Sequence, residues 1–226
     1  MIALDALGLT RLLQLASPAL PVGAYSYSQG LEAAIEDGCV NDAASAERWI
    51  RGVLEYSMGS FEAPLLWRML RARQNHDHEA FFHWNTLFRC GRETAELRAE
   101  TLQMAHGLCA LLQDLPSHEE LPDTDFDGWT FPAAYSCAAH RMGVESEAAL
   151  LGYLWSWLEN QVLAAVKAVP LGHRAGQRLL AAIGADLPRV AELAMQLGDD
   201  ELSNFAPGLA IASSRHETQY SRLFRS

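Results

Sequence analysis

The chain has 226 residues, of which 50% are hydrophobic and 20% are charged, and its formal net charge is −11. A chain this apolar can bury a large core, which excludes disorder throughout its length, and its size favours a single domain. The acidic balance is opposite to that of nucleic-acid-binding proteins, so we expect no nucleic-acid partner.

Apolar residues recur at helical spacing along almost the whole chain, and no stretch alternates for long enough to indicate a strand. The fold class is therefore predicted to be all-α, a single compact bundle of about ten helices. The predicted helices span residues 3–16, 27–37, 43–58, 61–74, 77–89, 93–113, 131–141, 146–168, 173–183 and 188–197.

Several of these boundaries carry local signals. Ser26, with Gln29 three residues later, forms a capping-box pattern, and Gly38 suits the end of the helix that follows. Pro132 stands where a first helical position is expected, and Pro170 ends the long helix before it.

The segment 153–169 has two different sides on a helical wheel. Asn160 and Lys167 lie on the polar side, roughly opposite the apolar arc. The arc contains Leu154, Leu158, Val162, Ala165 and Val169, and is widened by Trp155 and Val166. We therefore expect the arc to face the core, and Asn160 and Lys167 to face solvent or a partner.

The uncharged run 12–31 is long enough to raise the question of a membrane span. Pro18, Pro21 and Gly23 would break a spanning helix, so the run is predicted to be a loop between two helices, and no membrane partner is expected. The first residues lack the features of a secretory signal, and the four scattered cysteines fit reduced thiols. Both observations favour a cytoplasmic location.

Two other segments are predicted to lack regular structure. Residues 114–128 contain two prolines and six acidic residues, which indicates an exposed acidic loop. The C-terminal segment 213–226 is basic on an acidic chain and holds Leu223 and Phe224 between arginines. We expect this tail to be mobile by itself and to order against an acidic, apolar partner groove, with a frayed end as the alternative.

Tests for catalytic and metal-binding motifs give no positive result. Lys167, the only lysine, follows a valine, so the chain has no P-loop. The patterns HExxH and ExxH are absent, and no G-x-S-x-G follows a strand. We therefore expect a non-catalytic interaction protein without catalytic residues, metal ligands or a stably bound cofactor, or else an enzyme whose site these patterns do not reveal.

Four motifs together carry a resemblance to a known family. They are LLQLASPALPVGAYSYSQGLE at 12–32, RETAELRAE at 92–100, VLAAVKAVPLGHRAGQRLL at 162–180 and SSRHETQYSRLFRS at 213–226. With them the chain resembles the UreF family of urease accessory proteins. It departs from the family pattern at Ala24, where a second glycine is common, and at His173, where glutamine is usual.

The resemblance implies an all-α, non-enzymatic, cytoplasmic scaffold that commonly forms homodimers. Proteins of this family bridge the accessory protein UreD, called UreH in some organisms, and the GTPase UreG on apo-urease. They support GTP-dependent insertion of nickel and regulate when the GTPase acts. The resemblance also implies a place for the family on the route that nickel takes.

The residues expected to meet partners come from the tail, the loop and the polar helix side. Those expected to bind the UreD-type partner are Arg215, His216, Glu217, Tyr220, Arg222, Leu223, Phe224, Arg225, Tyr25 and Ser26. Lys167 and Asn160 are expected to face the GTPase, where a flexible point charge can respond to the bound nucleotide. The simpler alternative for Lys167 is a surface lysine that covers apolar neighbours.

Two alternatives to the scaffold stay open. One is a helical-bundle enzyme with a small-molecule pocket lined by aromatic side chains such as Trp84, Trp155 and Trp157. The other is a direct nickel carrier that uses His76 and His78.

Overall fold

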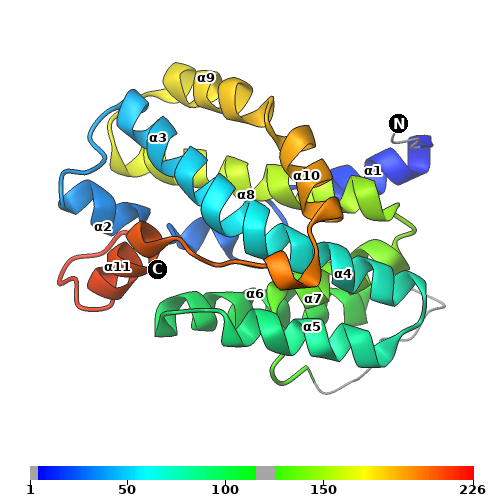
Figure 1. Ribbon diagram of the computed structural model, residues 1–226. Coiled ribbons are helices and arrows are strands. Elements are labelled where there is room, and N and C mark those ends of the chain that lie inside the picture. Colours follow the sequence, from blue (N-terminus) through cyan, green and yellow to red (C-terminus); the bar gives the residue numbers. More distant parts are fainter. Residues whose placement is uncertain (1–4, 116–125) are drawn as a thin grey trace.

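The computed structural model describes residues 5–115 and 126–226, and within these ranges the fold is all-α, without a strand (Figure 1). The predicted fold class is confirmed. The α-helices are α1 (Ala6–Leu15), α2 (Leu31–Glu36), α3 (Ala43–Val53), α4 (Ala63–Gln74), α5 (His78–Cys90), α6 (Ala95–Asp114), α7 (Phe131–Arg141), α8 (Ser146–Ala168), α9 (His173–Gly184), α10 (Leu187–Gln196) and α11 (Pro207–His216). Most of the predicted acidic loop lies outside the described residues.

Helix α8 runs through the middle of the fold, and α1, α2, α3, α4, α7, α9 and α10 pack around it (Figure 1). Leu154 and Leu158 on its apolar side are completely buried, whereas Leu163 and Lys167 on its other side are exposed. The predicted two-sided pattern is therefore confirmed at these positions. Trp155 is an exception: it is 39% exposed, because it lies at the edge of the arc beside α9.

The predicted break between residues 58 and 61 is wrong. Helix α3 continues into α4 through a π-helical stretch, Leu54–Glu62. Gly59 fits inside this stretch, where a Cβ atom would lie 3.0 Å from the Leu54 carbonyl oxygen. The glycine is thus accommodated within the helix instead of ending it, and Glu62, the last residue of the stretch, is buried.

Helix α2 begins later than predicted, and the capping box of Ser26 and Gln29 is wrong. Gln29 and Gly30 have φ angles of 53° and 75°, in the left-handed region, so the helix begins at Leu31 without a side-chain cap. Residues Ala24–Ser26 form a short 3-10 turn instead.

The remaining boundary signals are confirmed. Gly38 has a φ of 75° just after α2, Pro132 lies in the first turn of α7, and α8 ends at Ala168 before Pro170. Helix α11 is a structural element that the pattern analysis missed. It begins with Pro207, packs on α2, and brings the end of the chain beside the loop that precedes α2 (Figure 1).

Candidate functional site

The C-terminal segment lies against the protein's own surface. The Arg225 amide donates to the Ser26 carbonyl at 2.7 Å. In return, the Ser28 and Gln29 amides donate to the Ser226 carbonyl at 2.6 and 3.1 Å, and the Ser28 hydroxyl donates to the same oxygen. The expectation that 213–226 lacks regular structure is wrong for residues 213–216, which end α11. The last two residues of the segment pair with Ser26, Ser28 and Gln29 of the loop.

A carboxylate from α2 receives the tail at its apolar pair. Glu32, which is buried, accepts hydrogen bonds from the Leu223 amide at 2.7 Å and from the Phe224 amide at 2.9 Å. These charge-assisted bonds fix the backbone of the pair. They place Phe224 inside, at 5% exposure, and Leu223 outside, at 59% exposure.

A second set of charges holds the turn between α11 and the tail. The His216 side chain is completely buried, and its Nδ1 and Nε2 lie 2.7 Å from Glu96 and 3.3 Å from Glu32. Arg222 lies 2.6 Å from the other oxygen of Glu96. The basic tail therefore finds its acidic partners within this chain, on α2 and α6. We call Glu32, Glu96, His216 and Arg222 the tail cluster.

The ten residues expected to bind the UreD-type partner divide by exposure. His216 and Phe224 are buried and face the interior, so in this arrangement they anchor the tail. Ser26 and Glu217 are partly exposed. The exposed residues are Tyr25, Arg215, Tyr220, Arg222, Leu223 and Arg225.

The two residues expected on the GTPase side lie beside the same segments. Lys167 is exposed, and its Nζ lies 4.5 Å from the centre of the Phe224 ring. The Asn160 side-chain amide donates to the Tyr27 carbonyl at 3.0 Å. The structure thus brings the polar side of α8 next to both the loop and the tail, which residue spacing alone did not predict. We call the exposed residues Tyr25, Leu163, Lys167, Leu223 and Arg225 the composite surface.

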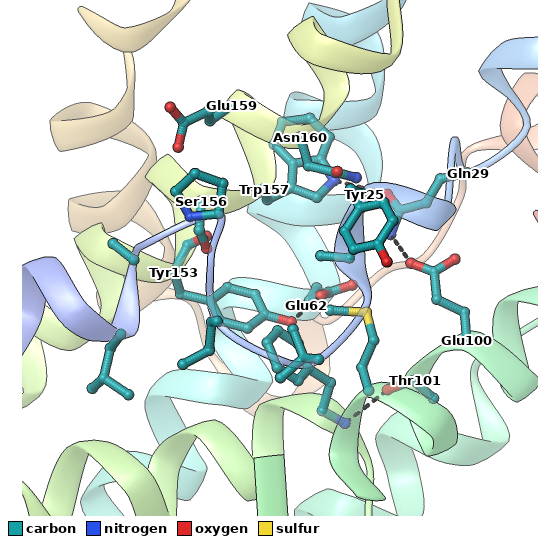
Figure 2. Close-up of a pocket in the computed structure, with 18 of the residues that line it drawn as sticks. Tyr25, Gln29, Glu62, Glu100, Thr101, Tyr153, Ser156, Trp157, Glu159 and Asn160 are labelled. Atoms are coloured by element: carbon teal, nitrogen blue, oxygen red, sulfur yellow. Dashed lines mark hydrogen bonds between the residues drawn. The ribbon is translucent and has the colours of Figure 1, made fainter. Parts of the chain in front are cut away.

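A pocket lies beneath the loop at one side of this surface, between α1, α6 and α8 (Figure 2). Figure 2 shows Tyr25, Asn160 and Trp157 gathered on one side of it, with Gln29 hydrogen-bonded to Glu100. Its apolar lining includes Leu15, Leu20, Val22, Leu97, Met104 and Phe131. Of the three tryptophans expected to line a pocket, only Trp157 lines this one, donating its indole N–H to the Gln29 side chain at 2.8 Å.

Buried charged side chains form one part of the polar lining of the pocket. Arg92 pairs with one oxygen of Glu62, and the Tyr153 hydroxyl donates to the other. Burial, followed by the charge of Glu62, raises the pKa of Tyr153 well above its ordinary value, so the phenol keeps its proton and remains a donor. We call Glu62, Arg92 and Tyr153 the core cluster.

Glu100 lies between the core cluster and the tail. It accepts hydrogen bonds from the Gln29 side chain at 2.8 Å and from the Ser226 hydroxyl at 2.7 Å. Burial raises the pKa of Glu100 to about 7, although both hydrogen bonds act in the opposite direction. This carboxyl group therefore gains or loses its proton near neutral pH, at the point where loop, tail and α6 meet.

Comparisons with known proteins identify the family. The family model described as UreF matches residues 40–184. The chain belongs to the UreF family. It is 56% identical over 225 residues to the urease accessory protein UreF of Azoarcus sp. strain BH72, covering 97% of this chain and 96% of that protein. The UreF proteins of Janthinobacterium sp. strain Marseille and Methylobacillus flagellatus are 51% and 50% identical over 226 residues, covering 99% and 96% of this chain and 100% and 97% of theirs.

Sequence reasoning missed the acidic residues that receive the tail of this UreF-family chain. Glu96 and Glu100 are four residues apart in the motif RETAELRAE, so they share one face of α6. That spacing, together with a basic tail on an acidic chain, was a usable signal for internal pairing. Glu32 gave no comparable signal, because its partners lie 184 to 192 residues away.

The histidines expected in a direct nickel carrier lie elsewhere on the molecule. His76 is exposed, and its ring meets that of His140 edge-on with centres 5.8 Å apart, while His78 begins α5. In the part of the chain that the structure describes, no three His, Cys, Asp or Glu side chains gather in a metal-binding group. Across residues 5–115 and 126–226, every helix is too short or too polar to span a membrane.

Proposed function

We propose that this UreF-family chain is a non-catalytic scaffold of urease maturation, which bridges a UreD/UreH-type protein and the GTPase UreG on apo-urease and regulates GTP-dependent nickel insertion. Its relatives of 50–56% identity are named urease accessory proteins, over nearly the full length of both chains. The observation that carries the bridging role is the composite surface, where loop, tail and α8 present exposed anchors side by side.

The UreD-type partner is proposed to bind the loop and tail portion of this surface. Tyr25 is 70% exposed and Leu223 is 59% exposed, and both are attached to backbone that internal hydrogen bonds hold in place. Aromatic and arginine side chains are enriched at the centres of protein interfaces. Tyr25, Leu223 and Arg225 therefore supply a small apolar centre with a cationic edge that needs no refolding to bind.

The GTPase is proposed to bind next to it, at Lys167 and Asn160. This chain contains no P-loop, so nucleotide chemistry belongs to the partner, and the scaffold acts through contacts that depend on the bound nucleotide. Because Lys167 contacts the tail, the two partner sites on this surface are contiguous.

Affinity measurements with the purified UreD-type partner test the first site. Truncating a central interface anchor costs on the order of 2 kcal/mol, so Tyr25→Ala and Leu223→Ala should each weaken binding about 30-fold. Phe205→Ala is the matched control, because Phe205 is 76% exposed and lies outside the composite surface. Unchanged affinity in both Tyr25→Ala and Leu223→Ala would overturn the assignment of this surface.

Two further measurements test the rest of the proposal. Lys167→Ala should leave partner assembly largely intact and alter GTP hydrolysis by the assembled complex or the yield of active urease. Sedimentation of the isolated chain tests the homodimer that the family membership leads us to propose. A hydrolysis rate and a urease yield both equal to wild type would remove Lys167 from the GTPase site.

A further inference from the structure

Phe224 is the one large apolar side chain that the end of the chain buries. Among residues 217–226 only Phe224 and Ser226 are buried. The Phe224 amide is held by Glu32 from α2, and its ring faces the Lys167 ammonium from α8 at 4.5 Å. Phe224 therefore contacts two helices: the Glu32 carboxylate of α2 binds its backbone amide, and the Lys167 ammonium of α8 lies against its ring.

The ammonium of Lys167 can form further hydrogen bonds or an ion pair. Within the described part of the chain it forms no ion pair, and its contact is the Phe224 ring. An ammonium carries three donors, and a ring face satisfies it only partly. A carboxylate from a partner would therefore be a stronger attraction than the ring, and it would draw the flexible side chain outward.

We propose that Lys167 is a positioning residue that couples the GTPase site to the tail: when a partner carboxylate takes its ammonium, Phe224 loses its cation and the tail loosens. This inference rests on the proposed function for the identity of the partner. The contact within the free chain is independent of it. Coupling is reciprocal, so a partner that holds the tail in place favours the lysine on the ring and disfavours its capture.

The loosening would reach the loop as well as the tail. Arg225 and Ser226, which follow Phe224, pair with Ser26, Ser28 and Gln29. When the Phe224 ring is released, the hydrogen-bonded pairs next to it in the chain lose a neighbouring anchor and open more often. The loop next to Tyr25, proposed to face the UreD-type partner, thereby responds to an event at the GTPase site.

Hydrogen exchange of the free chain tests the positioning role directly. Lys167→Met keeps the apolar stem and removes the charge. An exposed cation–π contact corresponds to an about two- to five-fold effect, so exchange at Leu223, Phe224 and Arg225 should accelerate by that factor. Arg174→Met, which removes an exposed cation on α9, is the matched control, and Lys167→Arg should restore slow exchange.

A double-mutant cycle separates the ring contact from a general effect of charge. In a Phe224→Leu background the apolar anchor remains but the ring is gone, so adding Lys167→Met should change tail exchange no further. Equal acceleration by Lys167→Met in both backgrounds, or no acceleration in the wild-type background, would overturn the positioning role.

The partner half of the inference needs the GTPase. Adding purified UreG with a GTP analogue should accelerate exchange at Phe224 and Ser28 in the wild type, and should have no such effect in Lys167→Met. Binding of the GTPase without that acceleration would overturn the coupling and leave the proposed function standing. Failure of the GTPase to bind at all would overturn the proposed function and the partner half, whereas the exchange of the free chain would still decide the positioning role.

Discussion

The core cluster and the tail cluster both place carboxylates beside cations, yet they hold very different parts of the molecule. In the core cluster, the side chains of Glu62 and Arg92 are only 7% and 5% exposed. In the tail cluster, Arg222 is 35% exposed, and two of the four members come from the last eleven residues of the chain. The first cluster joins helices to one another, and the second joins a chain end to helices.

This difference determines how much of the structure should be destabilised when each cluster is broken. The core cluster is buried beside the pocket, where the start of α4, the segment before α6 and α8 meet, so its residues cannot separate without disturbing these elements. The residues after α11 can leave the cluster while the helices remain packed, since Phe224 is the only large buried side chain among residues 217–226. Breaking the first should therefore lower global stability, and breaking the second should open the structure locally.

Removing the cation of the core cluster should have the largest effect. Arg92→Met leaves the buried Glu62 with the Tyr153 hydroxyl and no cation, and an uncompensated buried charge costs about 3–5 kcal/mol. Urea unfolding followed by circular dichroism measures the loss. The double variant Glu62→Leu/Arg92→Met should recover much of it, because no charge is then left unpaired. A loss below about 1 kcal/mol in the single variant would contradict the structural role of the pair.

Glu100, which lies between the two clusters, makes the stability of the folded chain depend on pH. Its pKa is about 7 in the folded chain against an ordinary value of 4.5, so the folded state holds a proton that the unfolded state releases. The contribution of Glu100 to stability is therefore lost as pH rises from about 4.5 to about 7, and stays lost above that range. At about 1.4 kcal/mol per pKa unit, the loss is on the order of 3 kcal/mol.

The stability difference between wild type and Glu100→Gln isolates this group from the other carboxylates. The glutamine has the same size and does not titrate, so wild type should lose stability relative to Glu100→Gln as the pH is raised from 5 to 7. A difference that is independent of pH would show that Glu100 does not change its protonation on folding.

An intermediate and local effect is expected for the receptor of the tail. Glu32→Gln removes the charge that binds the Leu223 and Phe224 amides and faces His216, and losing such bonds costs about 1–3 kcal/mol. Exchange should accelerate in the tail, with little change in the urea midpoint of the whole chain. Glu36→Gln, an exposed site on the same helix, is the control. Equal destabilisation of tail and core would contradict the separation of the two clusters.

The helices around these clusters were largely predictable because their signals are local. The bounds of α7 and α8 match the predicted 131–141 and 146–168, where long apolar periodicity coincides with a proline near a boundary. The start of α2 was not predictable in this way, because the left-handed Gln29 is stabilised by partners on α6 and α8.

The sequence shows which residue types the candidate site contains, but not which way their side chains face. The basic composition of residues 213–226 and their apolar pair are visible in the sequence, and their role at a partner surface stays a prediction. That Phe224 faces inward and Leu223 faces outward depends on Glu32, whose position relative to the tail only the folded chain defines. The contact between Lys167 and Phe224 has the same origin, since each residue alone looks like an ordinary surface or tail residue.

The smallest effect is expected at the rim of the tail, at Arg215. This residue lies 2.5 Å from Asp37, but the two side chains are 63% and 38% exposed. Exposed ion pairs contribute at most about 1 kcal/mol, since water competes for both charges and salt screens them. Arg215→Gln should therefore leave tail exchange within about five-fold of wild type, and this effect should vanish at high salt. Arg222→Gln should accelerate tail exchange more than Arg215→Gln does, because Arg222 also donates to the Gln219 and Glu217 carbonyls. If Arg215→Gln released the tail as fully as Glu32→Gln, the tail would be held by its rim charges and not by the buried members of its cluster.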